Sequence, residues 1–346
     1  MHNAMGLFGA LASGTLPQRI PVVCNLIDQG AIELGLGSRE YYSSAENVAE
    51  GQLRLLQKYG HDVAWGAHYI ARISEMLGAS HTVFPEHGPP NVGAMVIQSW
   101  DDIEKLTVPV DICEHPSFKI QAETIRLLRQ ELGGQIPICA FQVGAFTLPT
   151  ILMGICEWMT LLLSGPADLI GMMLTKCSDI SIALLKGFRQ AGADFVVYAN
   201  PFASPDFLTL SQIENMGLPW IRRDLECAGC DQVIYFSGGA RIAKTLPMLV
   251  EHTDIGVFYL NPFDDVSAAK NVVAGKALLA APVNDILLID RSRDAIRQSV
   301  RELVQAGAPG GGFILGTLMM PCQIPEANIH ALIEAAHEFG AYNVEA

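Results

Sequence analysis

The chain carries little charge, and basic side chains are the scarcest of its charged groups. Only 17% of its 346 residues are charged, and 22 Lys and Arg stand against 36 Asp and Glu, which gives a net charge of -14. A surface this acidic repels the phosphates of nucleic acids and of anionic membranes. Both are therefore excluded as partners, and a small or neutral ligand fits the charge better.

The chain also lacks a long apolar run and a regular cysteine spacing. Gly, Pro or charged residues interrupt every apolar run well before twenty residues, so no membrane span is predicted. Eight irregularly spaced cysteines, behind a start without a signal-peptide pattern, predict free thiols and a cytoplasmic location. Cys227 and Cys230 have redox or zinc spacing, but a single such pair is more often structural.

Half of the residues are hydrophobic, which is enough to bury one large core. We therefore predict a single domain over 1–346, with 1–20 as a helical or extended lead-in. Short apolar runs rich in Val, Ile, Ala and Phe are typical of parallel strands buried on both faces. Eight such runs predict strands at 21–27, 62–68, 137–143, 195–200, 232–237, 255–260, 277–281 and 312–316.

Helical patterns lie between these runs, at 45–59, 116–132, 167–191, 240–252, 292–306 and 326–339. Eight β/α alternations predict an α/β fold, the (β/α)8 TIM-type barrel. Two connections are longer than this barrel needs. The loop at 80–111, after strand two, predicts an extra hairpin, and 147–165, after strand three, predicts a Met-, Trp- and Leu-rich helix. They could cover the barrel mouth, pack on its wall or form a dimer face.

In such barrels the chemistry lies at the C-terminal ends of the strands. That rule selects His68, Tyr198 and Tyr235 as catalytic candidates, since tyrosine and histidine can donate a proton or orient a substrate. The same rule gives a polar set for substrate binding: Asp28, Tyr69, Gln142, Asn200, Ser237 and Asn261. Cys322 is a candidate metal ligand. The alternatives are a core histidine, tyrosines that fill the barrel and an inert buried thiol.

The C-terminal segment carries the clearest motif. A buried strand at 312–316 is followed by a loop from Pro321 that contains Cys322, and then by a helix that starts at Pro325. This segment resembles the end of the uroporphyrinogen decarboxylase superfamily, which includes zinc- and corrinoid-dependent methyltransferases. The resemblance extends through Gly88-Pro89, 99–103 and 191–194 over nearly the whole chain. It implies the barrel fold and a homodimer.

The resemblance also has departures. True uroporphyrinogen decarboxylases hold substrate carboxylates with arginines after the first strand and pyrrole nitrogens with an aspartate after the second. Here 25–33 contains no Arg, and Tyr69 stands at the aspartate position, so decarboxylation of a porphyrinogen is rejected. The methyltransferase members bind zinc through His-x-Cys after strand five and a Cys after strand eight. Tyr235 and Ser237 replace the first pair here, and Cys322 lies about three residues beyond the usual third position.

The resemblance therefore implies a methyltransferase that passes a methyl group from a small donor to a corrinoid protein. A methoxylated aromatic compound suits a pocket of Tyr, His, Asn and Gln side chains, because the cobalt of the corrinoid (cobalamin-type) partner does the difficult chemistry. Zinc, in a rearranged site with Cys322, is a further expectation. Two alternatives stay open: a lyase or decarboxylase that acts on a small acid, and a non-catalytic ligand-binding barrel.

Overall fold

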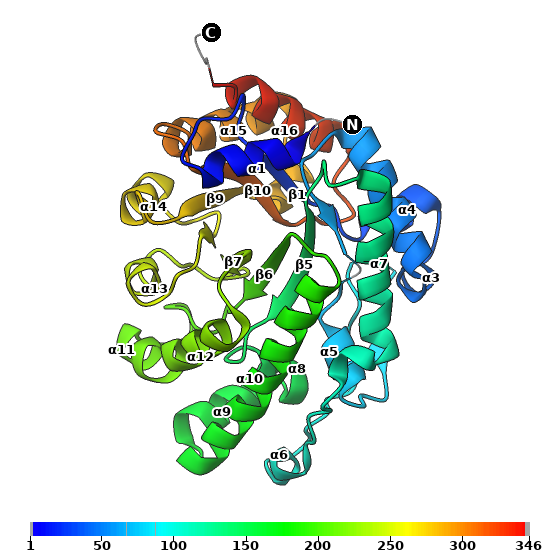
Figure 1. The fold of residues 1–346 in the computed structure, drawn as a ribbon, viewed down its shortest axis with the longest axis vertical. Coiled ribbons are helices and arrows are strands. Elements are labelled where there is room, and N and C mark those ends of the chain that lie inside the picture. The colour runs from blue at the N-terminus through cyan, green and yellow to red at the C-terminus, as the bar shows by residue number, and fades with distance from the viewer. Residues whose placement is uncertain (1–2, 67, 87, 343–346) are drawn as a thin grey trace.

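The computed structural model of the chain describes residues 3–66, 68–86 and 88–342. Its centre is a sheet of eight parallel strands in the order β1, β10, β9, β8, β7, β6, β5, β2, surrounded by helices (Figure 1). The strands are β1 Val22–Asn25, β2 Ala64–Trp65, β5 Ile138–Val143, β6 Phe195–Ala199, β7 Val233–Phe236, β8 Val257–Tyr259, β9 Leu278–Val283 and β10 Phe313–Met319. Each lies within or overlaps a predicted strand, so the predicted TIM-type barrel is confirmed.

The helices return the chain along the outside of the sheet. They are α1 Ala4–Ala12, α2 Gln29–Leu34, α3 Ser38–Ser43, α4 Ala45–Tyr59, α5 Ala71–Met76, α6 Asp101–Lys105, α7 Pro116–Leu132, α8 Leu148–Met153, α9 Ile155–Ser164, α10 Ala167–Gln190, α11 Leu210–Gln212, α12 Leu218–Ala228, α13 Leu246–His252, α14 Val266–Val273, α15 Arg293–Gly307 and α16 Glu326–Phe339. Short 3-10 turns occupy Ile112–Glu114 and Ile286–Leu288, and a π-turn occupies Ile213–Gly217.

Local signals explain why several helices match their prediction residue for residue. In α7, Pro116 stands in the first turn, the His115 side chain accepts a hydrogen bond from the Ser117 N–H at 3.1 Å, and Gly133 ends the helix at a φ of 56°. Proline at the start and a left-handed glycine at the end are the expected boundaries. Helices α4 and α16 also keep their predicted bounds.

Two helix predictions need correction. The single helix predicted within 147–165 is two helices, α8 and α9, because Gly154 between them adopts a φ of 90°. The helix predicted from residue 240 begins only at Leu246. The loop after β2 contains the predicted hairpin, in which β3 Thr82–Val83 pairs antiparallel with β4 Asn91–Val92.

Side chains along each strand alternate between the barrel interior and the helices. Val197, Ile234 and Tyr259 belong to an interior cluster, which also includes Phe8 and Leu11 of α1. The 1–20 lead-in thus contributes a helix that closes the N-terminal end of the barrel, near the top of Figure 1. The neighbouring strand residues belong to a separate cluster with the surrounding helices.

The barrel closes between β1 and β2 through a buried charge. Among the described residues no strand ladder joins these two strands. The Asp62 N–H donates to the Val22 carbonyl at 2.9 Å, and the Asp62 carboxylate accepts from the Val22 N–H at 2.7 Å. Arg19 donates to both carboxylate oxygens at 2.6 and 2.7 Å. Trp65 adds a hydrogen bond from its Nε1 to the Cys24 carbonyl at 3.0 Å.

We predict that Asp62→Asn lowers the free energy of unfolding by about 3–5 kcal/mol, because it leaves the Arg19 guanidinium without its buried partner. Denaturant unfolding measures the change. Glu334→Gln removes an exposed ion pair with Arg293 and serves as the control, with an expected change within about 0.5 kcal/mol. Equal losses in the two variants would contradict the role of Asp62 in closing the barrel.

Candidate active site

A cavity of about 650 Å³ opens at the C-terminal ends of β5, β6 and β7. Its floor includes Phe141, Val143, Ala199 and Phe236, and its outer wall is built by α8, α9 and the hairpin. Its polar lining comes from Asn91, Thr147, Thr150, Cys156 and Glu157. A larger cavity of about 800 Å³ lies beneath α1, at the opposite end of the barrel. Barrel enzymes build their active sites at the C-terminal end, so the first cavity is the candidate site.

The two long connections therefore cover the mouth, which was one of their predicted roles. Asn91, Val92 and Met95 line the cavity from the loop after β2, and the Gly154 break lets Ile155 line it from α9. Gly144, directly after β5, must be glycine, since a Cβ there would lie 2.0 Å from the Asn200 side-chain nitrogen. Asn200 itself is fully buried below this turn.

His68 lies against the wall of the cavity. Its ring stacks on Phe141 with 4.3 Å between the centroids, and its Nε2 atom has no hydrogen-bond partner among the described residues. Burial, with a smaller contribution from Arg72, lowers the pKa of His68 to about 3. The imidazole is therefore neutral at physiological pH, which suits a hydrogen-bonding group better than a proton donor.

The two candidate tyrosines lie on the other face of the sheet. Tyr198 is buried among the helices and donates a hydrogen bond from its hydroxyl to Asp224 of α12 at 2.6 Å. Tyr235 belongs to the same helix-facing cluster. Burial raises the pKa of both phenols. Neither phenol lines the cavity, so neither residue can reach a ligand bound there.

Three binding candidates also lie away from the cavity lining. Gln142 alternates with Phe141 and, fully buried, donates to the backbone carbonyl of Val143 at 2.8 Å. Asp28 accepts a hydrogen bond from the Tyr42 hydroxyl, and burial raises its pKa. Tyr69 donates to Glu75 at 2.8 Å and lines a separate groove outside the mouth.

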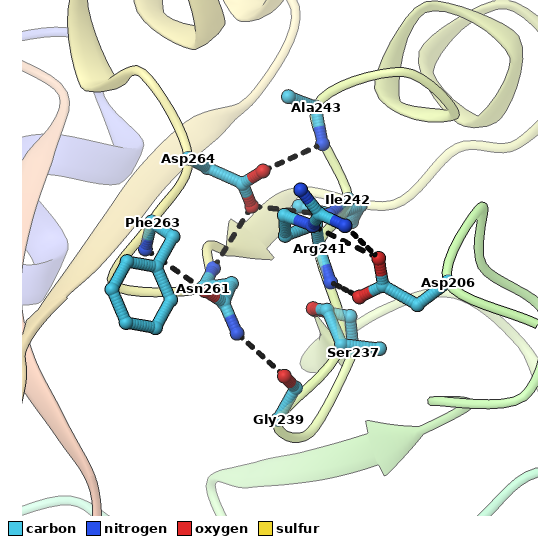
Figure 2. A network of polar contacts seen from close by, with 10 residues as sticks. Asp206, Ser237, Gly239, Arg241, Ile242, Ala243, Asn261, Phe263 and Asp264 are labelled. Carbon is cyan, nitrogen blue, oxygen red and sulfur yellow. Dashed lines mark hydrogen bonds and ion pairs between the residues drawn. The ribbon is translucent and has the colours of Figure 1, made fainter.

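Ser237 and Asn261 support the loops that follow β7 and β8. Ser237 donates from its hydroxyl to the Ala240 carbonyl at 2.7 Å, and Asn261 donates from its side chain to Gly239 at 2.7 Å. Figure 2 shows how the Asp264 carboxylate accepts the backbone N–H groups of Ile242, Ala243 and Asn261 at 3.0–3.2 Å. This network holds residues 240–245 in a turn, which is why α13 starts late.

The sequence prediction missed the apolar residues that form the cavity. Phe141 and Phe236 face it, whereas their neighbours Gln142 and Tyr235 face the helices. Strand parity could have found them, because residues two apart share a face. Selection by polar residue type at a strand end chose neighbours that face the helices instead of this cavity.

A second group of buried polar atoms lies at the β1, β9 and β10 side of the mouth. The side-chain amide of Asn25 and the hydroxyl of Tyr259 both donate to the Thr317 carbonyl. The Oδ1 atom of Asn25 has no partner among the described residues. The Oε1 atom of Gln29 and the Oδ2 atom of Asp285 are unpartnered there as well. Burial raises the pKa of Asp285 to about 6.

Comparison with known proteins is consistent with this geometry. The sequence profile of the Uroporphyrinogen decarboxylase (URO-D) family matches residues 4–339. The chain belongs to the uroporphyrinogen decarboxylase family. A methylcobamide:CoM methyltransferase (MtaA) of Methanosarcina barkeri is 22% identical over 96% of this chain and 97% of its own length. A uroporphyrinogen decarboxylase of Geotalea uraniireducens is 25% identical over 86% of each chain.

A solved methyltransferase of Methanosarcina mazei has the same fold. It superposes with a TM-score of 0.85 at 19% identity and covers 98% of this chain and 99% of its own. Within the uroporphyrinogen decarboxylase family the chain therefore keeps the complete barrel. Between residues 3 and 342, outside positions 67 and 87, no helix is long and apolar enough to cross a membrane.

The described residues do not fit the zinc site that the resemblance implies. No three His, Cys, Asp or Glu side chains among them gather as a metal ion requires. Cys322 lies near Asp28, and burial followed by the Asp28 charge raises the pKa of its thiol to about 11. Tyr235 and Ser237 occupy the other ligand positions. Tyr235 is buried among the helices, and the Ser237 hydroxyl donates to the Ala240 carbonyl. The family's zinc site is therefore not formed by the described residues.

We predict that Asp285→Asn stabilises the protein by about 1–2 kcal/mol at pH 8 and has little effect at pH 4. Its folded pKa of about 6 lies above the ordinary value of 3.8. The ionised Asp285 carboxylate therefore lowers the free energy of unfolding. This penalty is complete above a pH of about 6 and absent below the ordinary pKa of 3.8. Denaturant unfolding at both pH values measures this. Glu131→Gln, which removes an exposed carboxylate from α7, is the matched control, and an equal gain from Asp285→Asn at both pH values would contradict the prediction.

Proposed function

We propose that this chain is the methyl-donor-binding methyltransferase of a corrinoid-dependent system. The proposed donor is a small methoxylated aromatic compound, and the acceptor is the corrinoid of a separate protein. The family membership and the naming of a relative as a methylcobamide methyltransferase support the proposal. The observation that carries it is the apolar, aromatic-walled cavity at the C-terminal end of the barrel.

The lining of this cavity favours a neutral donor. Phe141 and Phe236 supply aromatic walls, with ring centroids 6.2 Å apart in an edge-to-face arrangement. A planar ring can pack against such walls. Glu157 is the charged residue of the lining, and neither Lys nor Arg contributes to it. A porphyrinogen with several carboxylates would find neither Lys nor Arg among the described residues of this lining, so porphyrinogen decarboxylation is not proposed.

In the proposed reaction the bond between methyl carbon and oxygen breaks, both electrons stay on the oxygen, and the resulting phenolate takes a proton. A reduced corrinoid, when bound, supplies the electron pair that accepts the methyl group. The barrel packs the donor against the sides of Phe141 and Phe236 that line the cavity, and α9 and the hairpin limit the access of water. His68 is neutral and lies behind Phe141, outside the cavity lining, where its stacked ring positions Phe141 for contact with the donor.

The rim of the mouth supplies a docking face for the corrinoid partner. Large apolar side chains are exposed there on three loops and one helix, namely Phe207, Phe263, Ile286, Leu287 and Ile155. Phe263 is 77% exposed, and its N–H donates to Asn261 within the Asp264 network (Figure 2). Exposed apolar groups around a pocket are typical of interaction sites. Homodimer formation and a cytoplasmic location stay predictions.

Methyl transfer is tested with purified protein, chemically reduced cobalamin and a panel of methoxylated aromatic compounds. We predict that Ile155→Trp, which fills the cavity, lowers methylcobalamin formation at least about 10-fold by excluding the donor. The formation of methylcobalamin is measured by its absorbance. Leu163→Trp is the matched control, because Leu163 lies on the same helix with 53% exposure against 54% for Ile155 but outside the cavity lining. Failure of every donor with the unaltered protein would overturn the proposed function.

Docking is tested by comparing two methyl acceptors. We predict that Phe263→Ser lowers the rate about 10-fold with a corrinoid protein as acceptor and changes it little with free cobalamin, because only the protein needs the rim. Leu16→Ser removes an exposed apolar side chain at the opposite end of the barrel and is the control. An equal loss with both acceptors would place Phe263 in donor binding instead.

A further inference from the structure

A groove of about 420 Å³ lies beside the candidate active site, on the other side of the β3–β4 hairpin. Tyr69 and Thr82 line the groove, whereas the adjacent Ile70 and the strand partner Val92 line the donor cavity. The hairpin and the start of α5 are therefore a shared wall. The groove also contains two arginines, Arg39 of α3 and Arg72 of α5.

Arg72 is a buried cation without an acidic hydrogen-bond partner. Arg72 is only 2% exposed. Its two Nη atoms donate to the backbone carbonyls of Ser117 and Tyr42 at 3.1 and 2.7 Å. Its Nε atom has no partner among the described residues. Burial lowers the pKa of Arg72, as expected for a guanidinium whose charge is poorly compensated.

Aromatic rings fix both guanidinium groups at the groove. The Arg72 Cζ atom lies 4.5 Å from the centroid of Tyr69, and the Arg39 Cζ atom lies 4.3 Å from that of Phe84. Such stacking orients a guanidinium and leaves its edge free to donate. Neither arginine takes part in an ion pair within the described part of the chain.

One carboxylate, that of Glu75, lines the groove, and three hydroxyl groups donate hydrogen bonds to it. Glu75 accepts hydrogen bonds from Tyr69 at 2.8 Å, Thr82 at 2.7 Å and Ser117 at 2.9 Å. Two guanidinium groups against one carboxylate leave an excess of positive charge in the groove of a protein whose net charge is -14. This local excess favours an anion.

We propose that this groove is a second ligand site, which binds a small organic molecule through a carboxylate or phosphate group. Arginine donates to both groups in pairs of parallel hydrogen bonds. The exposed edge of Arg39 supplies the donors, the buried Arg72 adds its positive charge, and Ser80 and His81 line the same groove. The proposal does not depend on methyl transfer, since the groove and the donor cavity have different linings.

The test is calorimetric titration of the full chain with benzoate, inorganic phosphate and the uncharged benzyl alcohol. We expect one or both anions to bind and benzyl alcohol not to bind, and the stronger of the two anions identifies the group. Arg39→Gln should weaken that binding about 10-fold or more, the loss expected for a charge-assisted hydrogen bond. Arg39 is exposed, so this change leaves the fold intact.

Arg54→Gln is the matched control, because it changes the net charge equally on the exposed side of α4, where Arg54 pairs with Glu50. It should bind the anion as the unaltered chain does, and so should Ile155→Trp in the donor cavity. Absence of binding by both anions, or equal affinities of Arg39→Gln and Arg54→Gln, would overturn the proposal. Loss of anion binding in Ile155→Trp would assign the anion to the donor cavity and overturn it as well.

Discussion

The contact on which the rest of the structure depends is the one between Asp62 and the start of β1. Seven neighbouring strand pairs are joined by ladders, but the β1–β2 junction is held by one carboxylate, one arginine and a few backbone groups. Closing this junction brings the loops after β1 and β2 together. The Tyr42–Tyr69 contact and the two-arginine groove lie across these loops, and the Tyr42–Asp28 hydrogen bond fixes Tyr42 within the segment after β1.

Buried or half-buried carboxylates also accept backbone N–H groups elsewhere in the barrel. Asp194 accepts the N–H of Ile138 at the start of β5, Asp224 accepts that of Ala145 after its end, and Asp264 accepts three N–H groups around β7 and β8. Each accepts a backbone donor where a strand begins or ends, and such donors are costly when they are buried without a partner. Part of the acidic excess therefore stabilises loop geometry and has no role in attracting a ligand.

The sequence predicted the strands and most helices because their signals are local. Runs of buried residues, the capped ends of α7 and the Pro325 start of α16 need no knowledge of the tertiary structure. The site was predicted less well. Tyr198 and Tyr235 end on the helix side because strand parity decides direction, and parity depends on where each strand begins. The Gly154 break has a local signal that was overlooked, whereas the two-arginine groove brings together segments far apart in the chain, which no local pattern contains.

The mouth is chemically divided, and this division bears on which donor the proposed reaction can use. The β5–β7 side is aromatic and apolar, while the β1–β10 side holds Asn25, Gln29 and Asp285 with unpartnered oxygens. Ser237 and Tyr235, at the family's ligand positions, are committed to a turn and to the helix layer. In the proposed reaction, hydrogen bonds then activate the leaving oxygen. A phenolate, whose charge the ring delocalises, needs less activation than an alkoxide. Under the proposed function, the lack of His and Cys at these two positions and the aromatic walls of the cavity thus favour the same class of donor, an aryl methyl ether.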